Sequence, residues 1–157
     1  MSSHEFAPIG HVSASRRDPE DDFWGGTEAR ITLAQGLDAD ALQGIDAFSH
    51  VEVIYLFDRV APERIVTGAR HPRNNADWPA VGIFAQRGKN RPNRIGTTIC
   101  RVLRLEGRSL VVAELDAIDQ TPVLDIKPVM REFLPRTPIK QPEWCVELMR
   151  QYWLPRD

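Results

Sequence analysis

The sequence lacks the features that mark membrane and secreted proteins. No apolar run approaches the ~20 residues that cross a bilayer, and the N-terminal MSSHEFAPIG has neither the basic nor the apolar region of a signal peptide. Its two cysteines, Cys100 and Cys145, form no CxxC pair and no disulfide framework, which agrees with a reducing compartment. We therefore expect a cytoplasmic protein without a membrane partner.

The motifs of several common catalytic and metal sites are also missing. GxxxxGK[ST], GxSxG and a GxGxxG that opens a helix after a strand occur nowhere, which argues against a P-loop, a nucleophile elbow or a Rossmann cofactor site. The four histidines are far apart, and the carboxylates Asp116, Asp119 and Asp125 lack the EF-hand spacing, so we expect no metal. His50 can be a base or a polar residue at a strand start, and its context favours the second role.

Positive charge is scarce in the chain as a whole but concentrated in one stretch. The 157 residues carry a net charge of −2, which argues against a general nucleic-acid binder. Between residues 85 and 108, however, one acidic side chain stands against seven basic ones, namely Arg87, Lys89, Arg91, Arg94, Arg101, Arg104 and Arg108. This segment indicates an anionic partner, and the alternative is that its arginines only solvate one face of a sheet.

Strand patterns dominate the sequence. Short β-prone or alternating runs are followed by Gly, Pro, Asn and Asp, which mark turns. Glu106-Gly-Arg108 predicts a tight hairpin turn between two of these runs. The predicted strands are 30–33, 50–57, 81–85, 97–105, 109–115 and 123–126. Several short strands separated by turns indicate a barrel or a sandwich, so the chain is predicted to be mainly β.

Helix is predicted at two places only. Asp38–Gln43 followed by Gly44 suggests about two turns. In the tail, Pro142 precedes a run in which Trp144, Leu148 and Tyr152 recur on one helical face, which predicts an amphipathic helix over about 141–153 packed on the core. At this length we expect one domain spanning 1–157, with its core at about 6–135.

Three blocks of the sequence resemble a known family. FSHVEVIYLF (48–57), GIFAQRGKNRPNRIG (82–96) and LDAIDQTPVLDIKP (115–128) are similar, in order and spacing, to the signature blocks of the TsaA/TrmO family, whose YaeB-like members are S-adenosylmethionine-dependent methyltransferases. The resemblance implies a compact antiparallel β-barrel, a homodimer and bound S-adenosylmethionine. It also implies methylation of N6 of threonylcarbamoyladenosine beside the anticodon of tRNA.

The resemblance also implies roles for individual residues. Lys89, Arg91 and Arg94 would contact tRNA phosphates, which supply affinity independent of sequence. Asp58 and Asp116 are the candidates for a catalytic base, and the choice between them stays open. Contacts to the cofactor would come from Asp22, Phe23, Trp24, Asp58, Arg59, Arg87, the turn from Ile95 to Thr97, Glu114, Leu115, Asp116 and Ala117.

Three departures from the family blocks affect what the resemblance can predict. The family's RPNP is RPNR here, with Arg94 in place of proline, its DGTP is DQTP, with Gln120 in place of glycine, and a histidine is replaced by Asp58. Two alternatives therefore stay open beside the tRNA enzyme. One is an S-adenosylmethionine-dependent methyltransferase of a small metabolite, and the other is a non-catalytic barrel that binds RNA or a ligand.

Overall fold

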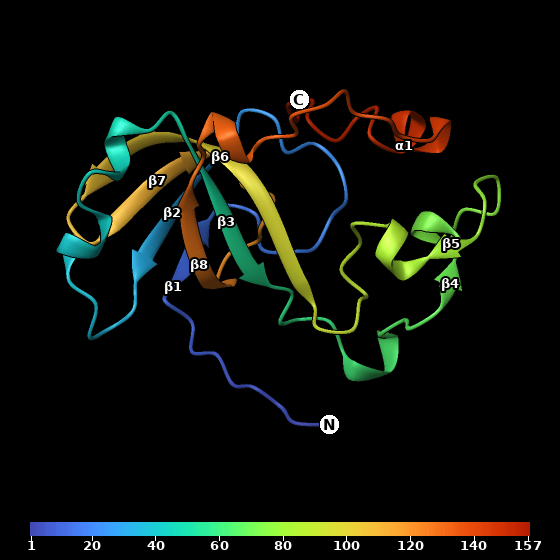
Figure 1. The fold of residues 1–157 in the computed structure, drawn as a ribbon, viewed down its shortest axis with the longest axis horizontal. Helices are drawn as coiled ribbons and strands as arrows, with labels where there is room; N and C mark the ends of the chain where they lie inside the picture. Colours follow the sequence, from blue (N-terminus) through green and yellow to red (C-terminus); the bar gives the residue numbers. More distant parts are fainter.

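The computed structural model describes residues 1–157 and contains a closed barrel of antiparallel strands (Figure 1). Neighbouring strands follow the order β1-β2-β7-β6-β3-β8 around the barrel. The six strands are β1 (Gly10–Ala14), β2 (Glu28–Leu33), β3 (His50–Leu56), β6 (Ile95–Glu106), β7 (Ser109–Ala113) and β8 (Pro122–Pro128). This architecture confirms the predicted mainly-β barrel, while β1 was not predicted.

Alternation along the strands fills the interior of the barrel. In β3, Val51, Val53 and Tyr55 are buried while the residues between them are half-buried, as expected for a strand whose side chains point in and out in turn. Branched aliphatic side chains from five strands meet there with Cys100 of β6, and burying each aliphatic one contributes about 1.5–3 kcal/mol. The fully buried centre is formed by Val12, Ile31, Val51, Val53, Leu110, Val112 and Val123.

The hairpin between β6 and β7 forms as predicted. Glu106 pairs with Ser109, so the connection has two residues. Gly107 has φ +59, the left-handed conformation that this short turn requires and that glycine adopts without strain. β6 is the longest strand and runs from this turn to the other end of the barrel, where Gly96 pairs with Tyr55 of β3.

A long excursion, residues 57–94, links β3 to β6 and projects away from the barrel beside the C-terminal helix (Figure 1). It holds a two-stranded sheet of β4 (Ala69–Arg70) and β5 (Val81–Gly82). The strand predicted over Val81–Ala85 is therefore wrong at its second half, because the chain turns into the 3₁₀ helix η5 (Ile83–Ala85). Two further 3₁₀ turns, η3 (Pro62–Arg64) and η4 (Pro72–Asn74), each begin with proline.

The helices are shorter than predicted. Within residues 38–43 there is one 3₁₀ turn, η1 (Ala39–Leu42), and the short 3₁₀ turn η2 (Ile45–Ala47) follows it. Another 3₁₀ turn, η6 (Arg131–Phe133), comes after β8. The tail helix α1 spans only Glu143–Leu148. It ends there because the next residues bind the main chain of another loop, described below. None of the helices is long and apolar enough to cross a membrane.

Asp125 and Lys127 stand among apolar residues, a pattern that suggests a site or an internal ion pair, yet both side chains are exposed on β8, so this interpretation is wrong. They pair with each other at 3.6 Å, with 51% and 63% of their side-chain surface exposed. Ile126 between them packs against the barrel core while these two residues take the outward positions, so their charges stay in water.

Candidate functional site

One end of the barrel collects most of the loops that carry the predicted site residues. Because all the strands are antiparallel, the last residues of β1, β3 and β7 lie at the same end as the first residues of β2, β6 and β8. The loop 15–27, the excursion 57–94 and the segment 114–121 therefore meet there. His50 starts β3 at the opposite end and bonds its neighbour Ser49 at 2.7 Å, which fits a structural role.

Asp116 lies at the centre of this end and accepts hydrogen bonds from three hydroxyl groups. Tyr55 donates to Oδ1 at 3.0 Å, and Thr98 donates to the same oxygen. The hydroxyl of Tyr152 donates to Oδ2 from the C-terminal segment. Both carboxylate oxygens are thus held by residues from β3, β6 and the tail, which fixes a side chain whose last torsion is otherwise loosely defined.

The buried environment keeps the neighbours of Asp116 protonated. Burial, followed by the charge of Asp116, raises the pKa of Tyr55 well above its ordinary value. The same two causes, in the same order, raise the pKa of Tyr152, so both phenols remain hydrogen-bond donors at neutral pH. Burial and Asp116 likewise raise the pKa of Cys100, which leaves its thiol protonated and a poor nucleophile.

The loop 20–26 forms one wall of the site. Trp24 is buried, and the guanidinium of Arg16 lies 3.6 Å from the centre of its ring. Arg16 also donates to the carbonyls of Asp22 at 3.0 Å and Phe23 at 2.6 Å, which fixes the loop over the barrel end. Burial lowers the pKa of Arg16, with repulsion from Arg156 as the second cause, although a guanidinium stays charged at neutral pH.

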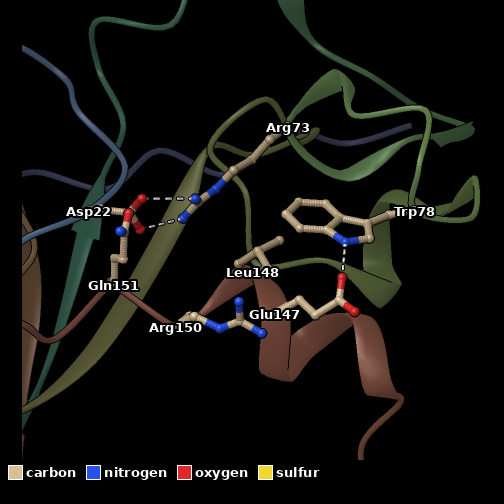
Figure 2. A pocket seen from close by; sticks show the side chains of 7 residues that line it. All are labelled: Asp22, Arg73, Trp78, Glu147, Leu148, Arg150 and Gln151. Atoms are coloured by element: carbon tan, nitrogen blue, oxygen red, sulfur yellow. Dashed lines mark hydrogen bonds and ion pairs between the residues drawn. The ribbon is translucent and has the colours of Figure 1, made fainter.

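A cavity of about 320 Å³ opens between this loop, the excursion and α1 (Figure 2). Arg73 forms a two-point ion pair with Asp22, at 3.0 and 3.1 Å, on one side of it. On the other side, the indole of Trp78 donates to Glu147 at 2.8 Å. Leu148, Arg150 and Gln151 complete the lining. The cavity thus offers charges of both signs and one aromatic side chain.

The basic loop, residues 86–94, is held mainly by hydrogen bonds that its own arginines donate to main-chain carbonyls. Arg91 donates to the carbonyls of Gln86 at 2.7 Å and Gly88 at 3.3 Å, and Arg94 donates to Val60 at 3.0 Å. Lys89 forms no side-chain hydrogen bond or ion pair with the rest of the chain. Of the three residues predicted to bind RNA, Lys89 is therefore the one whose side chain is not engaged by another part of the chain.

Some of the predicted cofactor residues form hydrogen bonds with neighbouring segments of this barrel end, and others do not. Arg87 donates to the carbonyl of Thr97 at 2.8 Å, and Glu114 accepts from the main chain of Gly26 at 3.1 Å. Leu115 and Ala117 flank Asp116 but are buried in the core. Arg59 bonds the carbonyl of Arg17, while the exposed Asp58 has no side-chain partner and Ile95 is 40% exposed.

Apart from Asp22, the residues that line the cavity were not predicted as site residues, and neither were the three partners of Asp116, namely Tyr55, Thr98 and Tyr152. Tyr55 and Thr98 belong to predicted strands, but no local pattern shows that their hydroxyls converge on one carboxylate. Arg73 lies in a polar loop where no sequence motif marks it. Its unusual φ of +53 is visible only in the structure. No group of three or more potential metal ligands is found among the described residues.

Two departures from the family blocks have positive φ. Arg94 has φ +53, a value closed to proline, and its main-chain N–H donates to the carbonyl of Arg91 at 3.0 Å. Gln120 has φ +70 in the turn that Thr121 closes by donating to Ile118 at 3.2 Å. That position of the turn favours glycine, so the glutamine adopts the same conformation at a cost in free energy.

The barrel, with its loops gathered at one polar end, is the fold seen in crystal structures of TrmO. TrmO from Pseudomonas aeruginosa superimposes with a TM-score of 0.68 and 26% identity, over 87% of this chain and 61% of that one. A second TrmO structure gives a TM-score of 0.74 at 23% identity, over 92% of this chain and 62% of the other, and it shows the fold alone. The class is thus a TrmO-like β-barrel.

Residues 18–133 match the model of the tRNA-methyltransferase O N-terminal domain, and the chain belongs to that family. The resemblance drawn from the three sequence blocks is therefore confirmed. Segment 134–157, which carries Tyr152, lies outside the matched range.

Curated relatives agree with the family and are longer than this chain. RcsF of Pseudomonas aeruginosa, whose name places it among S-adenosylmethionine-dependent methyltransferases, is 32% identical over 134 residues, which are 80% of this chain and 55% of RcsF. The tRNA (adenine(37)-N6)-methyltransferase of Mus musculus is 34% identical over 93 residues, which are 59% of this chain and 21% of the mouse enzyme.

Proposed function

We propose that this chain is an S-adenosylmethionine-dependent methyltransferase that methylates N6 of an adenosine beside the anticodon of tRNA, with threonylcarbamoyladenosine as the acceptor. The observation that carries the proposal is the contact between two family blocks at one barrel end, where Tyr55 of the first block and Thr98, just after the second, both bond Asp116 of the third. The names of RcsF and of the mouse enzyme support the methyl donor and the tRNA adenosine.

The residues present suit the proposed donor. S-adenosylmethionine, when bound, supplies an activated methyl group on a sulfonium, together with an adenine and a zwitterionic amino-acid end. A cavity of about 320 Å³ lies at the lower end of the range for small-molecule sites. Its lining carries charges of both signs, of which the Arg150 guanidinium has no partner in the chain and suits the carboxylate of the donor, and Trp78 offers an apolar face. We assign donor binding to this cavity and to the Asp116 cluster beside it.

The chain then needs no covalent nucleophile, because its work is to hold donor and acceptor together. Fixing two reactants at near-attack distance lowers a barrier by about 7–11 kcal/mol. Tyr55, Thr98 and Tyr152 fix the Asp116 carboxylate for this purpose. With both of its oxygens occupied, Asp116 is assigned to positioning, and Asp58, which is exposed and unpaired, is the better candidate to accept the N6 proton.

On the RNA side we propose that Lys89, Arg91 and Arg94 meet the phosphate backbone of tRNA. Lys89 would do so directly, whereas Arg91 and Arg94 also shape the loop through its main-chain carbonyls. The loop belongs to the excursion between β3 and β6, which starts at the same barrel end as Asp116. A basic edge beside the donor site suits a polyanionic acceptor.

The proposal extends to assembly and compartment. We propose a homodimer that works in the cytoplasm. Exposed aromatic and aliphatic side chains, with 77% exposure for Phe84, 86% for Phe133 and 75% for Ile139, offer apolar surface that a second copy could cover. The unpaired cysteines, Cys100 and Cys145, suit a reducing compartment.

Transfer of a labelled methyl group from S-adenosylmethionine to tRNA tests this function. Purified chain should label tRNA from a strain lacking the gene, and nucleoside mass spectrometry should find the methyl group on N6 of threonylcarbamoyladenosine. The Asp58→Asn variant should lower kcat while leaving the Kd of the donor unchanged. No transfer to any tRNA despite donor binding would refute the tRNA substrate and favour a small metabolite.

A further inference from the structure

The segment Gln151–Pro155, which we call the C-terminal strap, is bound to the loop that walls the candidate site. The main-chain N–H groups of Phe23, Trp24 and Gly25 donate to the carbonyls of Gln151, Tyr152 and Leu154 at 3.2, 2.8 and 3.2 Å. Beyond the strap, Arg156 forms an ion pair with Glu20. The strap is therefore fixed to the loop by three main-chain hydrogen bonds and one isolated parallel bridge, between Gly25 and Pro155.

Gly25 shows how closely the strap is seated. A Cβ atom at this position would overlap the carbonyl oxygen of Trp153 and lie within 2.8–2.9 Å of main-chain atoms of Leu154 and Pro155. Because those atoms belong to the backbone, no side-chain rotation can relieve the overlap. Any residue larger than glycine must move the strap away from the loop.

The seating of the strap places one polar group against the site. The side chain of Tyr152 points inward, and its hydroxyl is the partner of Oδ2 of Asp116, whereas Tyr55 and Thr98 hold Oδ1. Without that hydroxyl, Oδ2 would have no hydrogen-bond donor from the protein, and the carboxylate would be held through Oδ1 alone.

We propose that Tyr152 is a positioning residue for methyl-donor binding, through which the C-terminal strap completes the site around Asp116. The proposal rests on the proposed function, because it concerns the same site. It assigns a role to a residue outside the range that matches the family model. The chemistry is a hydrogen bond from a neutral phenol to a carboxylate, a type of bond that is stronger than one between two neutral groups.

A calorimetric titration with S-adenosylmethionine tests the role of Tyr152. Tyr152→Phe keeps the ring and its edge-on contact with Trp153 and removes only the hydroxyl. We expect it to raise the Kd of the donor at least tenfold and to lower the melting temperature by only a few degrees, while the Kd of tRNA stays close to wild type. Phe6→Leu is the control, since the Phe6 side chain is 76% exposed and contributes no group to the site, and it should leave the Kd unchanged.

A second variant pair displaces the strap in the full-length chain. Gly25→Ala should weaken donor binding at least as much as Tyr152→Phe, whereas Gly68→Ala, at a site with open space around it, should not. In a double-mutant cycle, Tyr152→Phe should add little to Asp116→Asn, because both changes break one interaction.

Three results decide the matter. Unchanged donor affinity in Tyr152→Phe, with the wild type binding normally, would overturn the inference and leave the proposed function intact. Tighter binding in Tyr152→Phe and Gly25→Ala would also overturn it, since the strap would then compete with the donor. No donor binding by the wild type would refute the proposed function, and this inference with it.

Discussion

At the scale of single residues, the site depends on side chains whose partners are distant in sequence. Asp116 could be singled out in advance because it lies in a family block. Its donors Tyr55 and Tyr152 could not, because one lies in an apolar strand pattern and the other in a predicted helix. A hydrogen bond across 36 or 61 residues leaves no local signal in the sequence.

Restoring the family residue at positions 94 and 120 should have opposite effects on stability. Gln120→Gly relieves a left-handed glutamine and should raise the free energy of unfolding by about 0.5–1 kcal/mol. Arg94→Pro should lower it by more than about 1 kcal/mol, because φ +53 is closed to proline and the N–H bonded to Arg91 is lost. Urea unfolding measures both, and the same sign for the two changes would contradict the backbone assignment.

The tyrosines beside Asp116 predict how stability responds to alkaline pH. Folding raises the pKa of Tyr55 and of Tyr152, so their contribution is complete below the ordinary pKa of 10.0 and is lost as the pH rises toward the folded values. Each group should then reduce the free energy of unfolding by about 1.4 kcal/mol per pH unit. Urea unfolding between pH 9 and 11 should show a shallower decline for Tyr152→Phe than for wild type, and equal slopes would count against the buried phenol.

At the scale of elements, sequence patterns predicted strands better than they predicted their ends or the irregular segments. The alternation in β3 and the Glu106-Gly-Arg108 turn depend on local geometry, and both are confirmed. β1 was missed because GHVSA has a single strongly β-prone residue, and it is a strand because β2 and β8 pair with it on both sides. α1 ends early because the carbonyls of Gln151 and Tyr152 are bound by the loop at Phe23 and Trp24.

Gly96 in β6 links the strand to the Asp116 cluster. A Cβ atom there would lie 2.7 Å from the ring of Phe57 and 2.8 Å from that of Tyr55, which is buried and cannot move aside freely. Gly96→Ala should cost about 1–3 kcal/mol by overpacking and should also weaken donor binding by displacing Tyr55. Thermal unfolding and calorimetry test this, with Gly82→Ala, which has open space, as the control. A variant as stable as wild type would contradict the packing.

In the basic loop between η5 and β6, Lys89 supplies charge alone, whereas Arg91 also holds the loop through hydrogen bonds. Lys89→Ala should weaken tRNA binding and reduce the slope of log K against log salt by about 1, with donor affinity unchanged. Arg91→Ala should in addition lower stability, since its guanidinium bonds two carbonyls of the loop. Fluorescence anisotropy at several salt concentrations measures the binding of both variants, and urea unfolding shows which of them is less stable. A salt slope unchanged by Lys89→Ala would place the RNA elsewhere.

At the scale of the whole molecule, a barrel of short strands provides a rigid frame, and its function depends on what the frame holds at one end. Three loops and the C-terminal strap meet there, from regions separated by most of the chain. The family blocks identified two of these loops in advance, because the blocks include Arg87 and Asp116. The strap was predicted only as a packed helix, since its path depends on contacts that no periodicity describes.

The central claim is that this barrel end binds a methyl donor. Calorimetric titration of the wild-type chain with S-adenosylmethionine tests it most directly. We predict binding at sub-millimolar donor, weakened at least tenfold by Asp116→Asn. No heat of binding at millimolar donor, from a chain that melts cooperatively, would contradict the claim.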